Sequence, residues 1–167
     1  DRVYEIGAGY STKHGNSLKH LNEFTRMDFE ASYVSSDDLR DILTDVVKYI
    51  IDYVIAKCEN ELKYLDISIA VPESIPSITS SEAMSLFNKD NNERLDPTDE
   101  RKLCEYAKEQ YNCDYIFITD MPQATRPCYE KDGSGFVLLS NGIEIASGGE
   151  HTVTESELDT HLYGFPP

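Results

Sequence analysis

The sequence predicts an α+β fold, a mainly antiparallel sheet flanked by helices, and three observations support this class. In residues 2–10 and 23–30, successive side chains fall into two alternating sets, one for each face of a strand, which is the period of two that strands show. Residues 36–62 carry apolar side chains three and four positions apart, as in a helix with one wide buried face. The segment GFVLLSNGIEIASGG contains two apolar runs joined by Asn141-Gly142, a strong signal for a tight hairpin. Strands before and after a helical region favour an α+β domain.

The first two predicted strands are joined by a polar segment of roughly ten residues, whereas most hairpin loops have about two to five. Loops of this length are more often functional than structural, so this segment is a candidate functional element. The helix that follows has Ser35 or Ser36 available as a cap, with Asp37 and Asp38 at the positive end of its dipole. We expect it to continue to about Leu62.

Two shorter helices and a buried strand are expected next. Thr79 with Glu82 three residues later forms a possible capping box, and Asp96-Pro97 is typical of a helix start. The run DYIFITD is nearly continuous in apolar residues and predicts a central strand. One face of the second short helix should carry Leu103, Tyr106, Ala107 and Tyr111.

The composition suits one compact domain over residues 1–167, because 40% of the residues are hydrophobic. A formal net charge of −16 disfavours contact with phosphate backbones or anionic lipid, and no apolar segment predicts a membrane span or a secretory signal. Because the chain begins inside a strand-like pattern, we expect it to be part of a longer protein. The cysteines form no C-x-x-C pair, so we expect buried thiols in a reducing cytoplasm: Cys58, Cys104, Cys113 and Cys128.

Three segments carry a family resemblance. The first, VYEIGAGYSTKHGNSLKHLNEFTRMDFEASYV, has a strand, a polar loop and a second strand that contains H-L-x-E-F-T followed by D-x-E. The second is DYIFITDMPQATRPCYE, with Asp-x-Pro and R-P-x-Y, and the third is GIEIASGG. In this order they resemble the catalytic domain of class II aminoacyl-tRNA synthetases, specifically the aspartyl/asparaginyl branch of the archaeal and eukaryotic kind.

The resemblance implies ATP-dependent activation of aspartate or asparagine, with Mg²⁺ bound to the ATP, followed by transfer of the acyl group to tRNA. It also implies a cytoplasmic homodimer that reaches tRNA only through regions outside this chain, with no membrane partner. Catalysis in such enzymes is positional and electrostatic, without a protein nucleophile.

The resemblance further implies roles for individual residues. Phe24 corresponds to the ring on which adenine stacks, Glu23 to a carboxylate beside the nucleotide, and His20 to a loop histidine near the triphosphate. Glu144 corresponds to a carboxylate that holds Mg²⁺, a cation that normally takes one or two protein carboxylates besides phosphates. Without the resemblance, Phe24 would more often be a core residue and His20 an exposed loop residue. The amino-acid pocket would contain Arg126, Ser147, Gly148 and Gly149.

Several positions depart from the family pattern. The arginine that grips the α-phosphate aligns with Ser11, and the first acidic metal ligand aligns with Val137. A serine cannot supply a planar, permanently charged fork, and a valine cannot bind Mg²⁺. The Gln-Arg pair that reads aspartate aligns with Glu150 and His151. Only Lys13, which aligns with a glutamate of the family, and His20 remain as candidate catalytic residues.

Three functions are therefore open. The chain could belong to an active aspartate or asparagine ligase in which Lys13 and Lys19 replace the lost positive charge that contacts the phosphates. It could instead be an inactive synthetase-like paralogue that serves as a binding, regulatory or assembly subunit. A third alternative is a tRNA-independent relative that makes free asparagine from an aspartyl-adenylate and ammonia.

Overall fold

The computed structural model describes residues 1–10, 22–90, 95–122, 125 and 130–151. These residues form two compact units, Asp1–Ser35 and Ser36–Pro167, which are described separately. Helices and mainly antiparallel strands are both present, so the predicted α+β class is confirmed. A single catalytic domain over residues 1–167 stays a prediction.

The first unit is an antiparallel pair of strands, β1 (Arg2–Tyr10) and β2 (Glu23–Ala31), as predicted. Tyr10 lies opposite Glu23 at the end where the polar segment joins the strands. Because successive side chains point to opposite faces, the pair has one mostly apolar face and one mostly charged face. The apolar face carries Tyr4, Ile6, Ala8, Met27 and Phe29, and the charged face carries Glu5, Arg26, Asp28 and Glu30.

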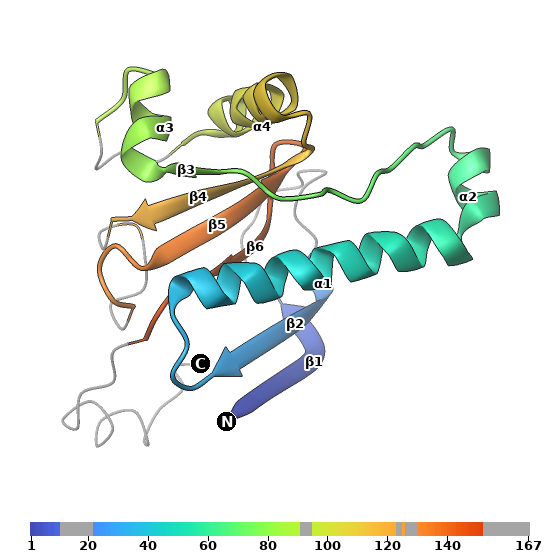
Figure 1. Cartoon of the computed structure of the whole chain (residues 1–167), viewed down its shortest axis with the longest axis horizontal. Helices are drawn as coiled ribbons and strands as arrows, with labels where there is room; N and C mark the ends of the chain where they lie inside the picture. Colours follow the sequence, from blue (N-terminus) through green and yellow to red (C-terminus); the bar gives the residue numbers. More distant parts are fainter. Residues whose placement is uncertain (11–21, 91–94, 123–124, 126–129, 152–167) are drawn as a thin grey trace. The chain divides into compact units, whose positions relative to one another are not determined.

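The second unit contains a four-stranded sheet in the order β3-β4-β5-β6, covered by helices on both faces (Figure 1). The strands are β3 (Ser77–Thr79), β4 (Tyr115–Met121), β5 (Gly135–Ser140) and β6 (Ile143–Gly148). The short strand β3 runs parallel to β4, and the other neighbouring pairs are antiparallel. One face is covered by α1 (Ser36–Lys57), and the other by α3 (Ser80–Leu86) and α4 (Pro97–Tyr111).

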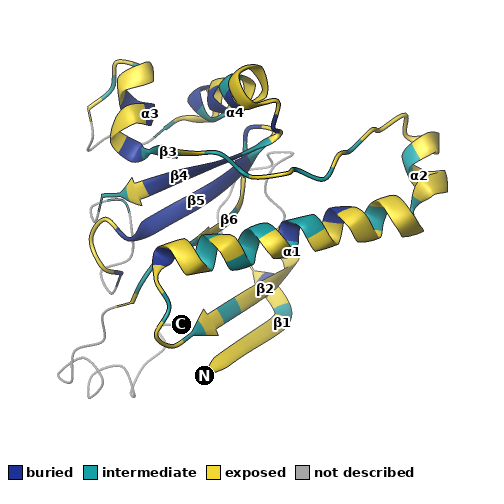
Figure 2. Cartoon of the chain, in the orientation of Figure 1, coloured by how far each residue is buried: buried dark blue, intermediate teal, exposed yellow. Residues whose placement is uncertain are grey.

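Both faces of the central strands are buried, which explains why DYIFITD and GFVLLS read as continuous apolar runs (Figure 2). Ile116, Ile118, Val137 and Leu139 pack with residues of α3 and α4. Phe117, Phe136 and Leu138 alternate with them and pack with Val47 and Ile51 of α1. The rings of Phe117 and Phe136 meet edge to face with centroids 5.9 Å apart, a favoured geometry for aromatic pairs.

The long helix is shorter than predicted. It begins at Ser36 with Asp37 and Asp38 in its first turn, as expected, but ends at Lys57 rather than near Leu62. Cys58 has φ −118° and ψ 33°, outside the helical range, and α2 (Glu59–Tyr64) then turns away from the axis of α1 (Figure 1). No residue of α2 is buried, so no packing holds the two helices on one line.

Both predicted caps of the shorter helices are confirmed. Thr79 and Glu82 form a reciprocal capping box at the start of α3. Asp96 accepts hydrogen bonds from the amides of Thr98 and Asp99, at 2.8 and 3.1 Å, at the start of α4. On α4, Leu103 and Ala107 are buried and Tyr106 is half-buried, as the expected face requires. Tyr111 is exposed instead, and its ring forms one aromatic pair among the described residues, a T-shaped contact with the ring of Tyr106.

The predicted turn between β5 and β6 is present. Asn141 and Gly142 both have positive φ, 51° and 70°, as the tightest hairpin turns require. The Gly142 amide donates a hydrogen bond of 3.2 Å to Cys104 Sγ, and a Cβ at position 142 would lie 2.2 Å from Arg101 Cγ. The turn is therefore packed tightly against α4.

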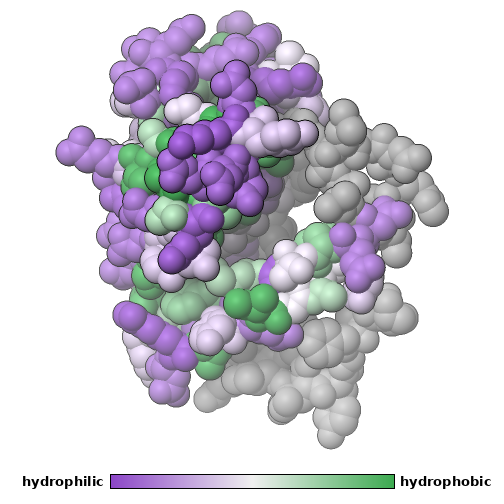
Figure 3. Space-filling model, turned by 90° about the vertical axis from the view of Figure 1, so that its right-hand side faces the viewer, coloured by the Kyte–Doolittle hydropathy of each residue, from purple (hydrophilic) through white to green (hydrophobic). Residues whose placement is uncertain are grey.

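Cys104 and Cys113 are buried as expected, Cys58 is half-buried, and Cys128 lies outside the described residues. None of the helices in the described ranges has the length and apolar character needed to cross a bilayer. Hydrophilic residues predominate on the face seen in Figure 3, and apolar residues form smaller groups between them.

Candidate functional site

A pocket of about 230 Å³ lies in the second unit, between the sheet and the helices α3 and α4. Its floor is apolar, and its polar groups come from a hydroxyl at the start of α3, a carboxylate of α4, a hydroxyl after β4 and a carboxylate of β6. The lining residues are Ser80, Ala83, Met84, Leu95, Glu100, Ile118, Met121, Thr125, Val137, Leu139 and Glu144. An apolar cavity with a few polar groups is the usual form of a small-molecule site.

Glu144, the predicted Mg²⁺ ligand, lies in the wall of this pocket. It is directly opposite Leu139 in the β5-β6 pair, and paired residues share a face, so its side chain is on the side of α3 and α4. Val137 lies on the same face but is buried, with only 6% of its surface exposed, and contributes hydrocarbon to the pocket. The structure therefore supplies one of the two carboxylates that the family resemblance leads one to expect on these strands.

A β-bulge in β6 determines which side chains share this face. Glu144 pairs with Leu139, but Ala146 pairs with Leu138, so Ile145 is an extra residue without a partner. Residues three apart in a regular strand point to opposite faces, whereas the bulge brings Glu144 and Ser147 onto the same face. Sequence reasoning missed this bulge, because the segment IEIASG carries no local signal for it.

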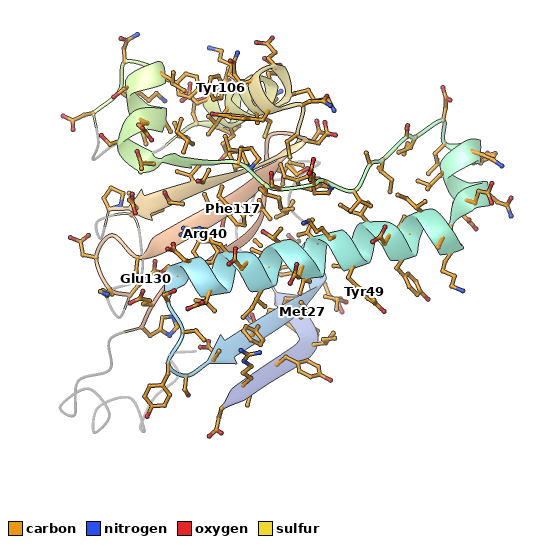
Figure 4. All side chains as sticks on the ribbon, in the orientation of Figure 1. Met27, Arg40, Tyr49, Tyr106, Phe117 and Glu130 are labelled. Atoms are coloured by element: carbon orange, nitrogen blue, oxygen red, sulfur yellow. The ribbon has the colours of Figure 1, made fainter. Side chains whose placement is uncertain are left out.

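At Gly148 and Gly149, which follow, neighbouring side chains occupy the space that a Cβ would need. A Cβ at Gly148 would lie 2.7 Å from the ring of Phe136, and one at Gly149 would lie 2.4 Å from the carboxylate of Glu130. Glu130 is itself buried, with 4% exposed, and lies at the end of the sheet where α1 begins (Figure 4). A side chain at either position would thus have to displace a buried neighbour, and contact of the two glycines with a substrate stays a prediction.

Glu150, which stands in place of a glutamine of the family pattern, joins β6 to the beginning of α1. Its carboxylate accepts a hydrogen bond of 3.2 Å from the Ser36 amide and pairs with Lys131 Nζ at 2.8 Å. These two partners hold the pKa of Glu150 below its ordinary value of 4.5, and Lys131 is the main cause. The backbone of the neighbouring His151 forms a β-bridge with Glu130. This region, which the resemblance predicts to bind the amino acid, therefore contains structural contacts in this chain.

In the first unit, Phe24 lies on the mostly charged face of the strand pair. It is directly opposite Gly9, and its ring covers the glycine so closely that a Cβ there would lie 2.6 Å from a ring carbon. The same face carries the ion pair of Arg26 and Asp28, with 2.8 Å between nitrogen and oxygen. Glu23 points to the other face beside Tyr10, since adjacent residues alternate. The aromatic ring and the carboxylate predicted for ATP thus lie on different faces of β2.

A family model for class II tRNA synthetases (D, K and N) matches residues 1–163. This chain belongs to that family. It is 30% identical to the aspartate–tRNA(Asp/Asn) ligase of Thermus thermophilus and 32% identical to that of Deinococcus radiodurans, over 95% and 90% of this chain. The aligned parts cover 40% and 39% of those two proteins, so the chain spans about two fifths of their length.

The fold of this synthetase chain is also that of solved synthetase structures. The aspartyl-tRNA synthetase of Entamoeba histolytica superimposes with a TM-score of 0.83 at 23% identity, over 90% of this chain and 35% of that one. This comparison supports the architecture described above, including the mainly antiparallel sheet and its flanking helices.

Some of the expected synthetase residues lie outside the described part of the chain. They include both candidate catalytic residues and the arginine expected in the amino-acid pocket, so their roles stay predictions. These residues are Ser11, Lys13, Lys19, His20 and Arg126.

The donor atoms of the pocket suit Mg²⁺, the cation that the synthetase family implies. Within the described ranges, no three His, Cys, Asp or Glu side chains are placed to hold a metal ion by themselves. Two carboxylates, Glu100 and Glu144, nevertheless line one pocket with the hydroxyls of Ser80 and Thr125. Mg²⁺ prefers such oxygen ligands and is usually bound by one or two carboxylates together with substrate phosphates. Glu100 follows a predicted helix start, but nothing in the sequence indicates that it lines a pocket with Glu144.

Proposed function

We propose that this chain forms the nucleotide- and amino-acid-binding part of an aspartate or asparagine ligase that charges tRNA. The observation that carries the proposal is the position of Glu144 in the wall of a partly apolar pocket. The similarity to aspartate–tRNA(Asp/Asn) ligases supports the choice of amino acids. The protein would act in the cytoplasm as a homodimer and contact tRNA through regions outside this chain.

In this proposal each residue has a limited task. Glu144 binds the Mg²⁺ of ATP, and the cation when bound neutralises charge on the phosphates. Phe24 stacks on adenine and His20 contacts the nucleotide, whereas the role of Glu23 requires that it contact the nucleotide from the other face of β2. The amino acid is held by the side chains of Ser147 and Arg126 and by the backbone of Gly148 and Gly149. Lys13 adds a positive charge beside the phosphates. The amino-acid carboxylate then attacks the α-phosphorus, which gives an aminoacyl-adenylate and pyrophosphate.

ATP–pyrophosphate exchange with the full-length protein tests this proposal. We expect exchange that depends on aspartate or asparagine, and Glu144→Ala should lower its rate about 10²–10³-fold, the usual effect of losing one charge-stabilising group. Glu105→Ala is a matched control, because Glu105 is an exposed acid of α4 that does not line this pocket. Absence of exchange with both amino acids would refute the proposed activity.

Two observations favour a second candidate, an inactive paralogue that binds or regulates other molecules. Val137 is part of the hydrophobic core where the family pattern has a metal ligand, and Glu150 is bound to Ser36 and Lys131. Such a protein would show no exchange and no Mg²⁺-dependent ATP binding. Calorimetric titration with ATP in the presence and absence of Mg²⁺ distinguishes the two candidates, since Mg²⁺-dependent binding excludes the inactive one.

A further inference from the structure

The pocket contains a second carboxylate, Glu100, that has no counterpart in the family assignments made above. Glu100 is in the first turn of α4 and lines the same pocket as Glu144 of β6. The two elements are joined next to these residues: the Gly142 amide donates to Cys104 Sγ, and Arg101 packs on Gly142. The carboxylates therefore belong to elements that contact each other beside the pocket.

Two acids close to Glu100 in the sequence hold the start of α4 in place. Asp96 caps the helix, and Asp99 is 6% exposed and pairs with Lys89. Lys89 also pairs with Asp96 at 3.1 Å and, as the main cause, lowers the pKa of Asp96 to about 2. This cluster fixes the beginning of α4. Within that turn, Glu100 is the acid that lines the pocket.

A buried hydroxyl gives independent evidence for a polar ligand. Ser80 is 3% exposed and lines the pocket, and its hydroxyl has no hydrogen-bond partner among the described residues. Every fully enclosed polar side-chain atom in that part of the chain does have a partner, so the Ser80 oxygen is not fully enclosed, and the pocket is the open space that Ser80 lines. A buried oxygen without a partner is costly in the absence of a ligand or water.

We infer that Glu100 and Glu144 together bind a divalent cation, with the Ser80 hydroxyl beside it. In this chain the second carboxylate would come from α4, because Val137 of β5 cannot supply it. Two carboxylates around a hard cation match the preference of Mg²⁺ for oxygen ligands, and the cation offsets the repulsion of the two charges. The inference rests on the proposed function only for the remaining ligands, which would be phosphate oxygens of ATP.

The test is a titration of the full-length protein with Mn²⁺, a paramagnetic probe for the Mg²⁺ site, followed by electron paramagnetic resonance with and without ATP. Glu100→Gln and Glu144→Gln should each weaken Mn²⁺ binding about 10-fold or more, as expected when a group of the metal site is lost. Glu105→Gln, on the same helix but outside this pocket, should bind like the wild type.

The outcomes separate this inference from the proposed function. If Glu144→Gln weakens binding and Glu100→Gln does not, the inference is wrong and the proposed role of Glu144 stands. If the wild type binds no Mn²⁺ even with ATP, both are wrong. Circular dichroism would check that each variant is folded. Should Glu100→Gln fail to fold, Glu100→Asp replaces it: the shorter side chain should weaken binding, and unchanged affinity would refute the inference.

Discussion

The ring of Phe24 owes its position to a glycine on the neighbouring strand. Its ring lies across Gly9 of the neighbouring strand, and a Cβ at position 9 would lie within 2.6 to 3.2 Å of three ring carbons. Carbon contacts under 3.0 Å essentially never occur, and two of the three are that short, so a larger residue would push the ring away from the strand. The orientation of Phe24 therefore depends on Gly9 as much as on its own backbone.

Gly9→Ala should for this reason weaken ATP binding if Phe24 stacks on adenine. The loss should not exceed the roughly 1–3 kcal/mol that such a stack contributes, and should resemble that of Phe24→Ala. Gly7→Ala is the control, since its Cβ would meet only the flexible end of Glu5, at 3.3 Å. Calorimetric titration with ATP measures all three variants, and equal affinity of the Gly9→Ala protein and the wild type would contradict the prediction.

Val137 and Glu150 show two outcomes of losing a family residue. At position 137 the substitution fills the core with hydrocarbon, whereas at position 150 the new carboxylate forms its own hydrogen bond and ion pair. Sequence reasoning identified both departures from the motif pattern. It could not identify the partners of Glu150, because Ser36 is 114 positions away and carries no local sign of the contact.

Among the elements, α1 depends on a distant residue for the start of its first turn. The amide of Ser36 is one of the orphan donors at the helix N-terminus, and Glu150 supplies both its acceptor and a negative charge at the positive end of the dipole. This contact also joins the helix to the end of β6, so it stabilises two elements together.

Glu150→Gln should lower the free energy of unfolding by about 1 kcal/mol at pH 7, the usual contribution of such a cap. The folded-state pKa is below 4.5, so the stabilisation is complete above about pH 4.5 and is lost as the pH falls through the lower folded value. Urea unfolding of both proteins at several pH values measures it. The difference between wild type and variant should shrink in acid, and a difference that grows there would be inconsistent with this account. Glu144→Gln, in β6, serves as control, because Glu144 takes no part in the bonds that Glu150 forms with Ser36 and Lys131.

The elements that sequence predicted best are those whose signals are local. Capping boxes at Thr79 and Asp96 and the turn at Asn141-Gly142 depend on side chains within three or four positions. The end of α1 at Cys58 and the bulge at Ile145 were not predicted, because packing against other elements, or its absence, decides them. The same reason explains why the contribution of α4 to the pocket was missed.

At the scale of the whole molecule, the net charge of −16 opposes compaction. Both faces of the sheet in the second unit are covered by apolar contacts, and these offset the repulsion between surface acids. The net charge disfavours contact with phosphate backbones, and that tRNA contacts lie in other regions stays a prediction.

Salt should consequently stabilise the folded chain at pH 7. Raising NaCl from about 0.01 M to 1 M shortens the screening length from about 30 to 3 Å, and each kcal/mol gained raises Tm by about 2–4 °C for a chain of this size. Calorimetry at a pH near 4.5, the isoelectric point, provides the control, since the salt effect should be much smaller there. A Tm that falls with NaCl at pH 7 would show that attractive ion pairs outweigh the net repulsion.

The bond between Ser36 and Glu150 also has a consequence for biosynthesis. The two residues are 114 positions apart, and ribosomes add about 5–20 residues per second, so the second partner is made roughly 6–23 seconds after the first. During that interval the beginning of α1 has left the ribosome or waits in its exit tunnel without its carboxylate. Any nascent helix there is frayed at its first turn, and translation speed sets how long a chaperone has to bind it.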